Sequence, residues 1–234
     1  MLALLVVGSA TACSTSVAAL QQSSDPQSGV ATAMAAQGVV RVGEGNRACT
    51  ATGDQVVCHG INAEETRGDL EEVEGLSGHV VTSLSLGRDF ACAGTAEGVW
   101  CWGSNANGEL GSDVVTASPL EAVQVPGVPG DVVSLASGRT HSCAATAEGV
   151  WCWGSNAFGQ IRGVASEGAM EATKVEVDPL VDLSSSGFET CGVSTADGMS
   201  SLVCWGNNRW GQISPLLSAE TLPPTVLAAT AQAS

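Results

Sequence analysis

The chain has 234 residues, of which 24 are acidic and 8 are basic, so its formal net charge at neutral pH is −16. The few, scattered basic residues argue against a nucleic-acid partner, which requires a positively charged face. Glycine contributes 29 residues, whereas charged residues make up only 14% and aromatic residues 4%. This composition excludes a coiled coil, a charged disordered chain and a collagen-like repeat, and it favours many short strands joined by turns.

The first thirteen residues have the pattern of an export signal. Leu2 to Val7 form an apolar run that is too short to span a bilayer permanently, and small residues lead from it to Cys13. The segment resembles a bacterial lipoprotein signal, in which the cysteine thiol takes a diacylglycerol and becomes the new N-terminus. It departs from that pattern because Ala10 replaces the usual leucine and no basic residue precedes the apolar run. Ordinary cleavage before Cys13 and an uncleaved apolar end are the alternatives.

Residues 14–37 are mainly Ser, Thr, Gln and Ala. Such a segment predicts a flexible tether, because it buries too little apolar surface to offset the entropy lost on ordering. We therefore expect an exported domain that a lipid on Cys13 anchors to the bacterial cell envelope. A secreted domain without the lipid is the alternative.

Eight further cysteines form four pairs with odd separations. Three pairs are 9 residues apart and the last is 13 apart, so each pair encloses an even number of residues. Residues with this spacing face each other across an antiparallel hairpin, and both separations give the closer type of pair. Zinc binding is the alternative, but two cysteines with eight residues between them do not have zinc-ligand spacing. The sequence therefore predicts four cross-hairpin disulfides: Cys49–Cys58, Cys92–Cys101, Cys143–Cys152 and Cys191–Cys204.

The midpoint of each cysteine pair predicts a turn. Gly53-Asp54 suits a two-residue turn with glycine first, and Asp197-Gly198 suits the hairpin turn in which both residues have positive φ. Ala96-Glu97 and Ala147-Glu148 suit two-residue turns less well. For these two hairpins, a four-residue loop that keeps the same register is an equal alternative.

The cysteine hairpins belong to a longer repeat. Residues 87–103 and 138–154 both contain Gly-Arg, then Cys, then Thr-Ala-Glu-Gly-Val-Trp-Cys-Trp-Gly, at an offset of 51 residues. A third copy lies at 187–206 and a more divergent one at 45–60. A β-rich stretch precedes each hairpin. A period of about 50 residues with several short strands indicates a propeller-like repeat array.

The repeat, Gly-x-x-His-x-Cys followed by Gly-x-x-Cys-Trp-Gly-x-Asn-x-x-Gly-Gln-Leu, resembles that of the regulator of chromosome condensation family. The resemblance covers about residues 38–214 and is weakest in the first copy, where His59 replaces the tryptophan. It implies a β-propeller with four-stranded blades. It also implies packing roles for three tryptophans and turn-shaping roles for three asparagines and three glycines: Trp102, Trp153, Trp205, Asn105, Asn156, Asn208, Gly108, Gly159 and Gly211.

The span has room for about four blades, whereas rings of this family usually have seven. We therefore predict an all-β, partial or four-bladed propeller, stapled by disulfides, with repeats at 38–78, 79–130, 131–178 and 179–214. An open arc would leave unpaired strand edges, which invite self-association. In the tail, residues 215–234, the stretch 223–227 suits an outer strand that closes on an earlier repeat.

Other candidate sites have structural explanations. Residues 43–48 mimic the Gly-x-Gly-x-x-Ala dinucleotide fingerprint, but that site needs a helix where we predict a hairpin. The acidic run 64–74 fits a solvated loop, with calcium or a cationic partner as the alternative. His59, His79 and His141 are not grouped, and the resemblance gives His141 a structural position. No nucleophile elbow, metal-protease motif or phosphate loop occurs.

These observations predict no catalytic residue, no metal and no cofactor. We expect a non-catalytic protein-binding or scaffold propeller whose unknown partner meets the loops at 63–77 and 111–129. One alternative is an exported hydrolase that uses a pair of acids. Another is enzyme inhibition, because relatives of similar repeat type include a secreted inhibitor of β-lactamases. Guanine-nucleotide exchange follows from family analogy, but the export signal, the acidity and the small number of blades oppose it.

Overall fold

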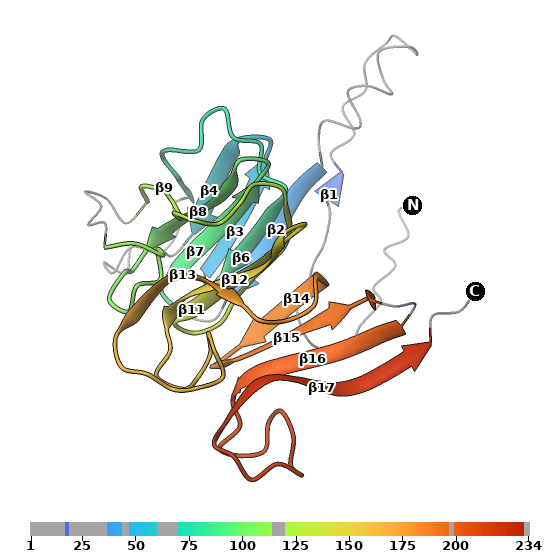
Figure 1. The fold of residues 1–234 in the computed structure, drawn as a ribbon. Coiled ribbons are helices and arrows are strands. Elements are labelled where there is room, and N and C mark those ends of the chain that lie inside the picture. Colours follow the sequence, from blue (N-terminus) through green and yellow to red (C-terminus); the bar gives the residue numbers. More distant parts are fainter. Residues whose placement is uncertain are drawn as a thin grey trace, which may run out of the picture.

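The computed structural model describes residues 17–18, 37–43, 47–59, 70–113, 120–196 and 199–231. Its strands form four antiparallel sheets that follow one another in chain order (Figure 1). The first sheet contains β1 (Val17–Ala18), β2 (Gln37–Gly43), β3 (Arg47–Thr52), β4 (Gln55–His59) and β5 (Leu70–Glu72). The second contains β6 (Ser83–Leu86), β7 (Phe90–Thr95), β8 (Gly98–Gly103) and β9 (Val123–Gln124).

The third sheet contains β10 (Val132–Ser137), β11 (His141–Thr146), β12 (Gly149–Ser155) and β13 (Ala169–Val175). The fourth contains β14 (Leu180–Ser186), β15 (Glu189–Ser194), β16 (Met199–Asn207) and β17 (Thr221–Ala231). The all-β prediction is therefore confirmed. No helix in the described part of the chain is long and apolar enough to cross a membrane.

The four sheets are the blades of an arc. β6 lies against β2 and β10, and β10 lies against β14, so the inner strands join neighbouring blades. These strands border a hollow of about 610 Å³. Among the described strands, β14 and β2 make no extended contact, although a closed four-bladed ring would bring them together. Figure 1 shows the first sheet at the upper end of the arc and the fourth at its lower end.

All four predicted disulfides are present. In each hairpin the two cysteines are direct cross-strand partners, with their Cα atoms 4.1 Å apart. The turn at Gly53-Asp54 has two residues, as predicted, because Thr52 pairs with Gln55. The turn at Asp197-Gly198 lies outside the described residues.

The turns at Ala96-Glu97 and Ala147-Glu148 also have two residues rather than four. The Thr95 hydroxyl explains the tight turn in the second blade, because it accepts a hydrogen bond from the Glu97 amide and donates one to the Gly98 carbonyl, both 3.1 Å long. Thr146 does the same in the third blade. A threonine side chain therefore closes turns that lack the usual Asn-Gly sequence.

The C-terminal tail differs from its predicted role. The tail stretch 223–227 belongs to β17, which pairs with β16 of the same blade and not with an earlier repeat. The cause is local, because the loop after β16 returns the chain antiparallel beside that long strand. The fourth blade therefore extends to Ala231. Within the predicted tether, β1 pairs with Gln37 and Gly38, whereas Cys13 lies outside the described residues.

Burial distinguishes the inner blades from the last one. Every residue of β7 and β11 is buried, because each of these strands lies between two neighbouring blades. Along β15, buried and half-buried residues alternate strictly. Alternation with period two means that one face of a sheet is covered and the other is not. The fourth blade is therefore covered on one side only by the described residues.

We predict that the C92A/C101A double variant loses more stability than the C191A/C204A variant. Loop closure alone accounts for about 2–3 kcal/mol in either case, with slightly more for the longer fourth loop. Cys92 and Cys101 are fully buried, so their removal also leaves a cavity between two blades, whereas Cys191 is only half-buried. Guanidinium unfolding, followed by tryptophan fluorescence, measures both losses. An equal or larger loss at the fourth disulfide would contradict this account.

Candidate functional site

Each disulfide packs against the following blade. The buried cluster between the first two blades contains Cys49, Cys58 and Trp102. The next cluster contains the Cys92–Cys101 disulfide and Trp153, and the third contains the Cys143–Cys152 disulfide and Trp205. All three tryptophans are fully buried. The predicted packing tryptophans therefore lie between blades, against the disulfide of the preceding one.

The indole nitrogens fix the tryptophans to the preceding blade. Trp153 donates a 2.9 Å hydrogen bond to the carbonyl of Glu109, and Trp205 donates a 2.8 Å hydrogen bond to the carbonyl of Gln160. The corresponding position for Trp102 is Thr66, which lies outside the described residues. Each acceptor carbonyl lies in the loop that follows the Trp-Gly pair of the preceding blade. This loop and the disulfide together form the surface that receives the next blade.

The predicted turn asparagines organise these loops. The Asn156 side chain accepts hydrogen bonds from the amide of Ile161 at 2.9 Å and donates to the carbonyl of Val164 at 2.9 Å. Gly159, in the same loop, has a φ of 73°, a value that favours glycine. The corresponding residues in the second and fourth blades make equivalent bonds or have similar φ values: Asn105, Asn208, Gly108 and Gly211.

His141 is fully buried at the contact between the third and fourth blades. Its Nε2 atom lies 2.8 Å from the hydroxyl of Thr190. Gly138, three residues before His141, leaves room for the imidazole ring, because a Cβ atom at this position would lie 2.3 Å from His141 Cε1. Burial lowers the pKa of His141 to about 4. The residue therefore joins two blades in its neutral form.

The other histidines lie elsewhere. His79 stacks on Trp100 with ring centroids 4.4 Å apart, and its Nδ1 atom lies 3.4 Å from the Glu97 carboxylate. The hydrogen bond with His79 lowers the pKa of Glu97. His59 ends β4 in the first blade. The described residues contain no group of three His, Cys, Asp or Glu side chains arranged to hold a metal ion.

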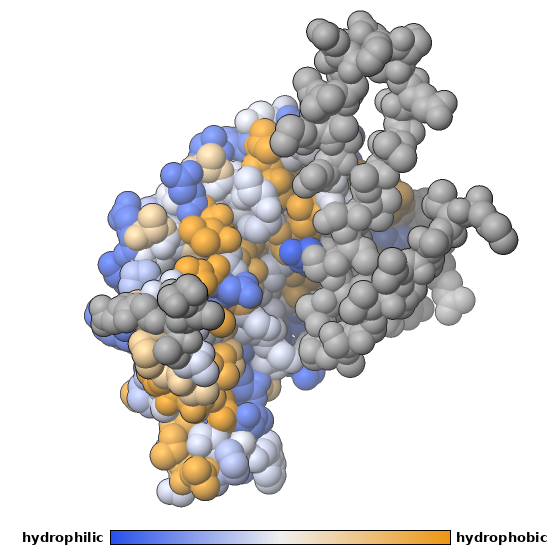
Figure 2. Space-filling model, turned by 90° about the vertical axis from the view of Figure 1, so that its right-hand side faces the viewer, coloured by the Kyte–Doolittle hydropathy of each residue, from blue (hydrophilic) through white to orange (hydrophobic). Residues whose placement is uncertain are grey.

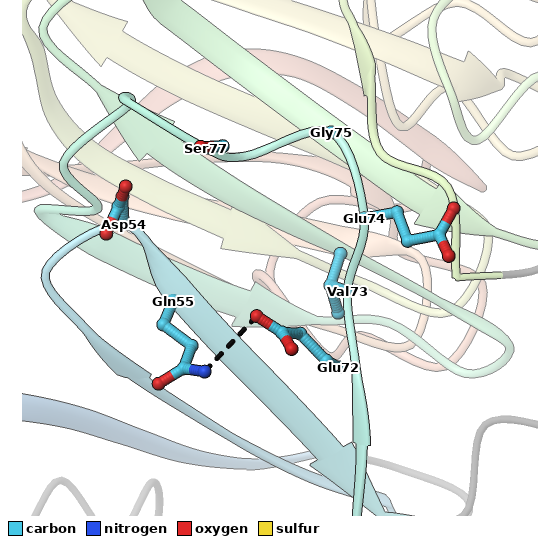
Figure 3. A pocket seen from close by; sticks show the side chains of 7 residues that line it. All are labelled: Asp54, Gln55, Glu72, Val73, Glu74, Gly75 and Ser77. Carbon is cyan, nitrogen blue, oxygen red and sulfur yellow. Dashed lines mark hydrogen bonds between the residues drawn. The ribbon is translucent and has the colours of Figure 1, made fainter.

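Part of the acidic run borders a groove of about 550 Å³ beside the first blade. Gln55 donates a 3.2 Å hydrogen bond to Glu72, and Asp54 accepts one of 2.8 Å from the amide of Gly78. Figure 3 shows the Glu74 side chain pointing away from Glu72 and Asp54. Because these carboxylates do not converge, the groove offers neither a cation cage nor a catalytic acid pair. The residues from 60 to 69 lie outside the described part of the chain.

The outer side of the fourth blade is not covered by another blade among the described residues. Thr190 lies against the third blade, 3.8 Å from Cys143 Sγ, so the adjacent Cys191 points the opposite way. We call this opposite side, with the loop after β16, the terminal face. It consists of the fourth disulfide, in which Cys191 is half-buried and Cys204 is only 1% exposed, and three apolar side chains: Leu202, Trp210 and Ile213.

Comparison between repeats shows what the terminal face lacks. Leu202 corresponds to Val99 and Val150, which are 0% exposed between blades, yet Leu202 is 39% exposed. Trp210 corresponds to Phe158, which stacks on Phe188 of the next blade at 4.4 Å. No such blade follows among the described residues. The terminal face therefore repeats an inter-blade surface without its cover.

Trp210 is 80% exposed, and Leu216 in the same loop is 92% exposed. In Figure 2, hydrophobic surface reaches the lower end of the molecule, where Figure 1 draws the loop between β16 and β17. The sequence predicted binding loops at 63–77 and 111–129, and it gave no expectation for the exposed apolar residues of the loop after β16. Trp210 could have indicated this surface from the sequence. It is an aromatic residue in a predicted turn, and Trp205 already fills the packing position of the same blade.

Comparisons with known proteins agree with this architecture. A family profile described as "Regulator of chromosome condensation (RCC1) repeat" matches residues 81–109 and 132–160, and a second profile with that description matches residues 97–145. The chain is 34% identical over 134 residues to "RCC1 domain-containing protein RUG3, mitochondrial" of Arabidopsis thaliana, covering 55% of this chain and 29% of that protein. It is 42% identical over 65 residues to alsin of Rattus norvegicus, covering 27% of this chain and 4% of alsin.

Among solved structures, a chain in the crystal structure of Kap60 bound to yeast RCC1 (Prp20) matches with a TM-score of 0.62 and 20% identity. The match covers 78% of this chain and 48% of that chain. The present chain thus spans less than a third of RUG3 and about half of the matched structure. It carries RCC1 repeats and has the fold of part of an RCC1-like β-propeller.

We predict that His141 makes stability depend on pH between about 6.5 and 4. The folded-state pKa is about 4 and the reference value is 6.5, so the unfolded chain binds the proton first as the pH falls. This contribution to stability is complete above pH 6.5 and is lost progressively down to about pH 4. The loss amounts to about 3 kcal/mol.

The matched variant is His141→Phe, because Phe90 occupies the same position in the second blade. Unfolding free energies at pH 7 and pH 4.5 measure the effect, and the variant should show a clearly smaller difference between the two. The same pH dependence in both proteins would contradict the role of His141.

Proposed function

We propose that the chain is a non-catalytic protein-binding scaffold that works in an oxidising compartment and binds through its terminal face. Four disulfides support the compartment, because structural disulfides persist in exported proteins and are rare in the cytosol. Polar residues of the repeat have structural roles, which supports a function without catalysis. Asn156 shapes a loop, and His141 is buried against Thr190.

The observation that carries the proposal is the exposure of the terminal face. Leu202 and Ile213 stand where the other blades bury their apolar residues, and Trp210 is 80% exposed beside them. Exposed tryptophans beside other apolar groups are typical anchors of protein–protein interfaces. The Arg209 guanidinium lies 5.6 Å from the Trp210 ring centroid, which supports the side chain in its exposed position. A rigid, disulfide-stapled blade presents this surface with little loss of entropy on binding.

The matched fold fits such a role. The solved structure that resembles this chain is a complex of yeast RCC1 with Kap60, so a propeller of this type takes part in a protein assembly there. The acidic groove suits catalysis less well than the terminal face suits binding, because its carboxylates diverge (Figure 3). Hydrolysis is the competing function. A panel of glycoside and peptide substrates tests it, and turnover abolished by a single Asp or Glu change would overturn the scaffold proposal.

We further propose that the scaffold is displayed from the bacterial cell envelope by a lipid on Cys13. The apolar run before this residue and the small residues at 8–12 support the proposal. Anchoring by one thioether-linked diacylglycerol supplies two acyl chains, which suffice for stable membrane attachment.

We therefore predict that mass spectrometry of the mature protein finds a diacylglycerol-modified N-terminal Cys13. Cys13→Ser should abolish the modification and release the protein from the membrane fraction. An N-terminus that begins with unmodified Cys13 would contradict lipidation but keep export. An intact Met1 would contradict both.

Photocrosslinking tests the binding face in intact cells. We predict that a photoreactive amino acid at position 210 gives a protein adduct, which mass spectrometry of the excised band identifies. The matched control places the same amino acid at Val164, which is 70% exposed in the loop after β12 of the third blade and is not one of the residues of the terminal face. Adducts of equal yield at both positions, or none at position 210, would contradict the terminal face as a binding site.

A further inference from the structure

We propose that the terminal face binds the first blade of a second copy of this chain, so that two arcs associate head to tail. This inference rests on the proposed function, because it names the partner of the same face. The repeated geometry of the arc supports it. The chain makes the same kind of blade-to-blade contact three times. The fourth blade carries one of the two surfaces of this contact on its outer side, and the first blade carries the other.

The first half is the terminal face. At the three contacts within the chain, a valine two residues before the second cysteine is completely buried by the following blade, namely Val56, Val99 or Val150. The fourth residue of this series, Leu202, is 39% exposed. In the loops, Leu110 and Ile161 are buried, whereas the corresponding Ile213 is only half-buried. The occupant that these positions are shaped to receive is therefore another blade.

The second half is the outer side of the first blade. Val56 and Cys58 pack toward the second blade, so their neighbours in β4, Val57 and His59, point to the opposite side. β5 adds Leu70 to that side, because Leu70 is the cross-strand partner of His59 and is 67% exposed. This side corresponds to the one through which the second, third and fourth blades contact their predecessors. His59 stands at the tryptophan position, facing outward from the first blade.

The strand edges are less suitable for association than the faces. The outer edge of the fourth blade is β17, which carries Pro223 and Pro224. Proline has no amide hydrogen to donate to an added strand, so these residues protect the edge. The sequence predicted self-association through open strand edges. Our proposal places it instead on the apolar faces at the two ends of the arc.

The span of the arc favours a closed pair over a longer chain of copies. The aligned part, 78% of this chain, covers 48% of the RCC1 chain that it resembles, so two such parts are about as long as one complete propeller. Head-to-tail contacts form rings when the rotation closes and filaments when it does not. Two four-bladed arcs bring together eight blades, so closure requires a ring with one blade more than the seven that are usual in this family. Both ends of both copies are then covered.

Sedimentation velocity of the full oxidised chain tests the inference. At micromolar concentration and 0.15 M salt we expect a dimer. Leu202→Asp should give a monomer, because a carboxylate at the centre of the contact loses its hydration there. Leu70→Asp should do the same from the other end. The matched control is Val226→Asp, which changes an apolar residue of 60% exposure that pairs with Val203 on the other side of the fourth blade and should remain dimeric.

Mixing the two monomeric variants gives the sharpest result. In a head-to-tail pair, the intact terminal face of L70D meets the intact first blade of L202D, so the equimolar mixture should again contain dimers. Non-reducing peptide mapping and circular dichroism confirm that each variant is folded with its four disulfides.

A wild-type chain that remains monomeric would overturn the inference. A dimer that L70D leaves intact would also overturn it, because that result means two terminal faces meet each other. A ladder of larger species would contradict the closed pair. These failures are separable from failure of the proposed function. A crosslink from position 210 to a different protein, together with a monomeric wild type, keeps the function and removes the second copy.

Discussion

The arc depends on one contact, in which the disulfide of a blade is covered by the tryptophan of the next. Neither partner is sufficient alone, because short four-stranded sheets such as these bury little surface by themselves. The disulfide fixes the hairpin register, and the following indole excludes water from the sulfur atoms. Trp153 and Trp205 also donate to carbonyls of the preceding loop, at Glu109 and Gln160, so an apolar contact gains a directional bond.

The same contact explains why the ends of the arc differ from its centre. The two inner blades are covered on both sides, so even their central strands β7 and β11 contain no exposed residue. The last blade repeats the sequence pattern of the others without a following blade in the described chain, and its Leu202 and Trp210 side chains are exposed. Repeat proteins usually end in a polar capping unit. Leu202 and Trp210 are apolar and exposed, which supports our proposal that the terminal face is an interaction surface rather than a cap.

Much of this organisation was predictable from the sequence, because cysteine parity and a 51-residue offset constrain strand pairing directly. The four disulfides and the all-β class follow from those two observations. The two-residue turns at Ala96 and Ala147 were not predictable from turn propensities, because a threonine hydroxyl in the strand closes them. The terminal face was also missed, since exposure depends on which neighbour is present. Leu202 and Val150 both stand two residues before the second cysteine of their hairpin, but their surroundings differ.

The central claim is that each disulfide is sealed by the blade that follows it. The rates at which the four disulfides of the native chain are reduced by a small phosphine, at a dilution where the chain is monomeric, test this most directly. The account predicts that Cys191–Cys204 reacts many-fold faster than Cys92–Cys101 and Cys143–Cys152, whose sulfur atoms lie beneath another blade. Equal rates for these three disulfides would contradict it.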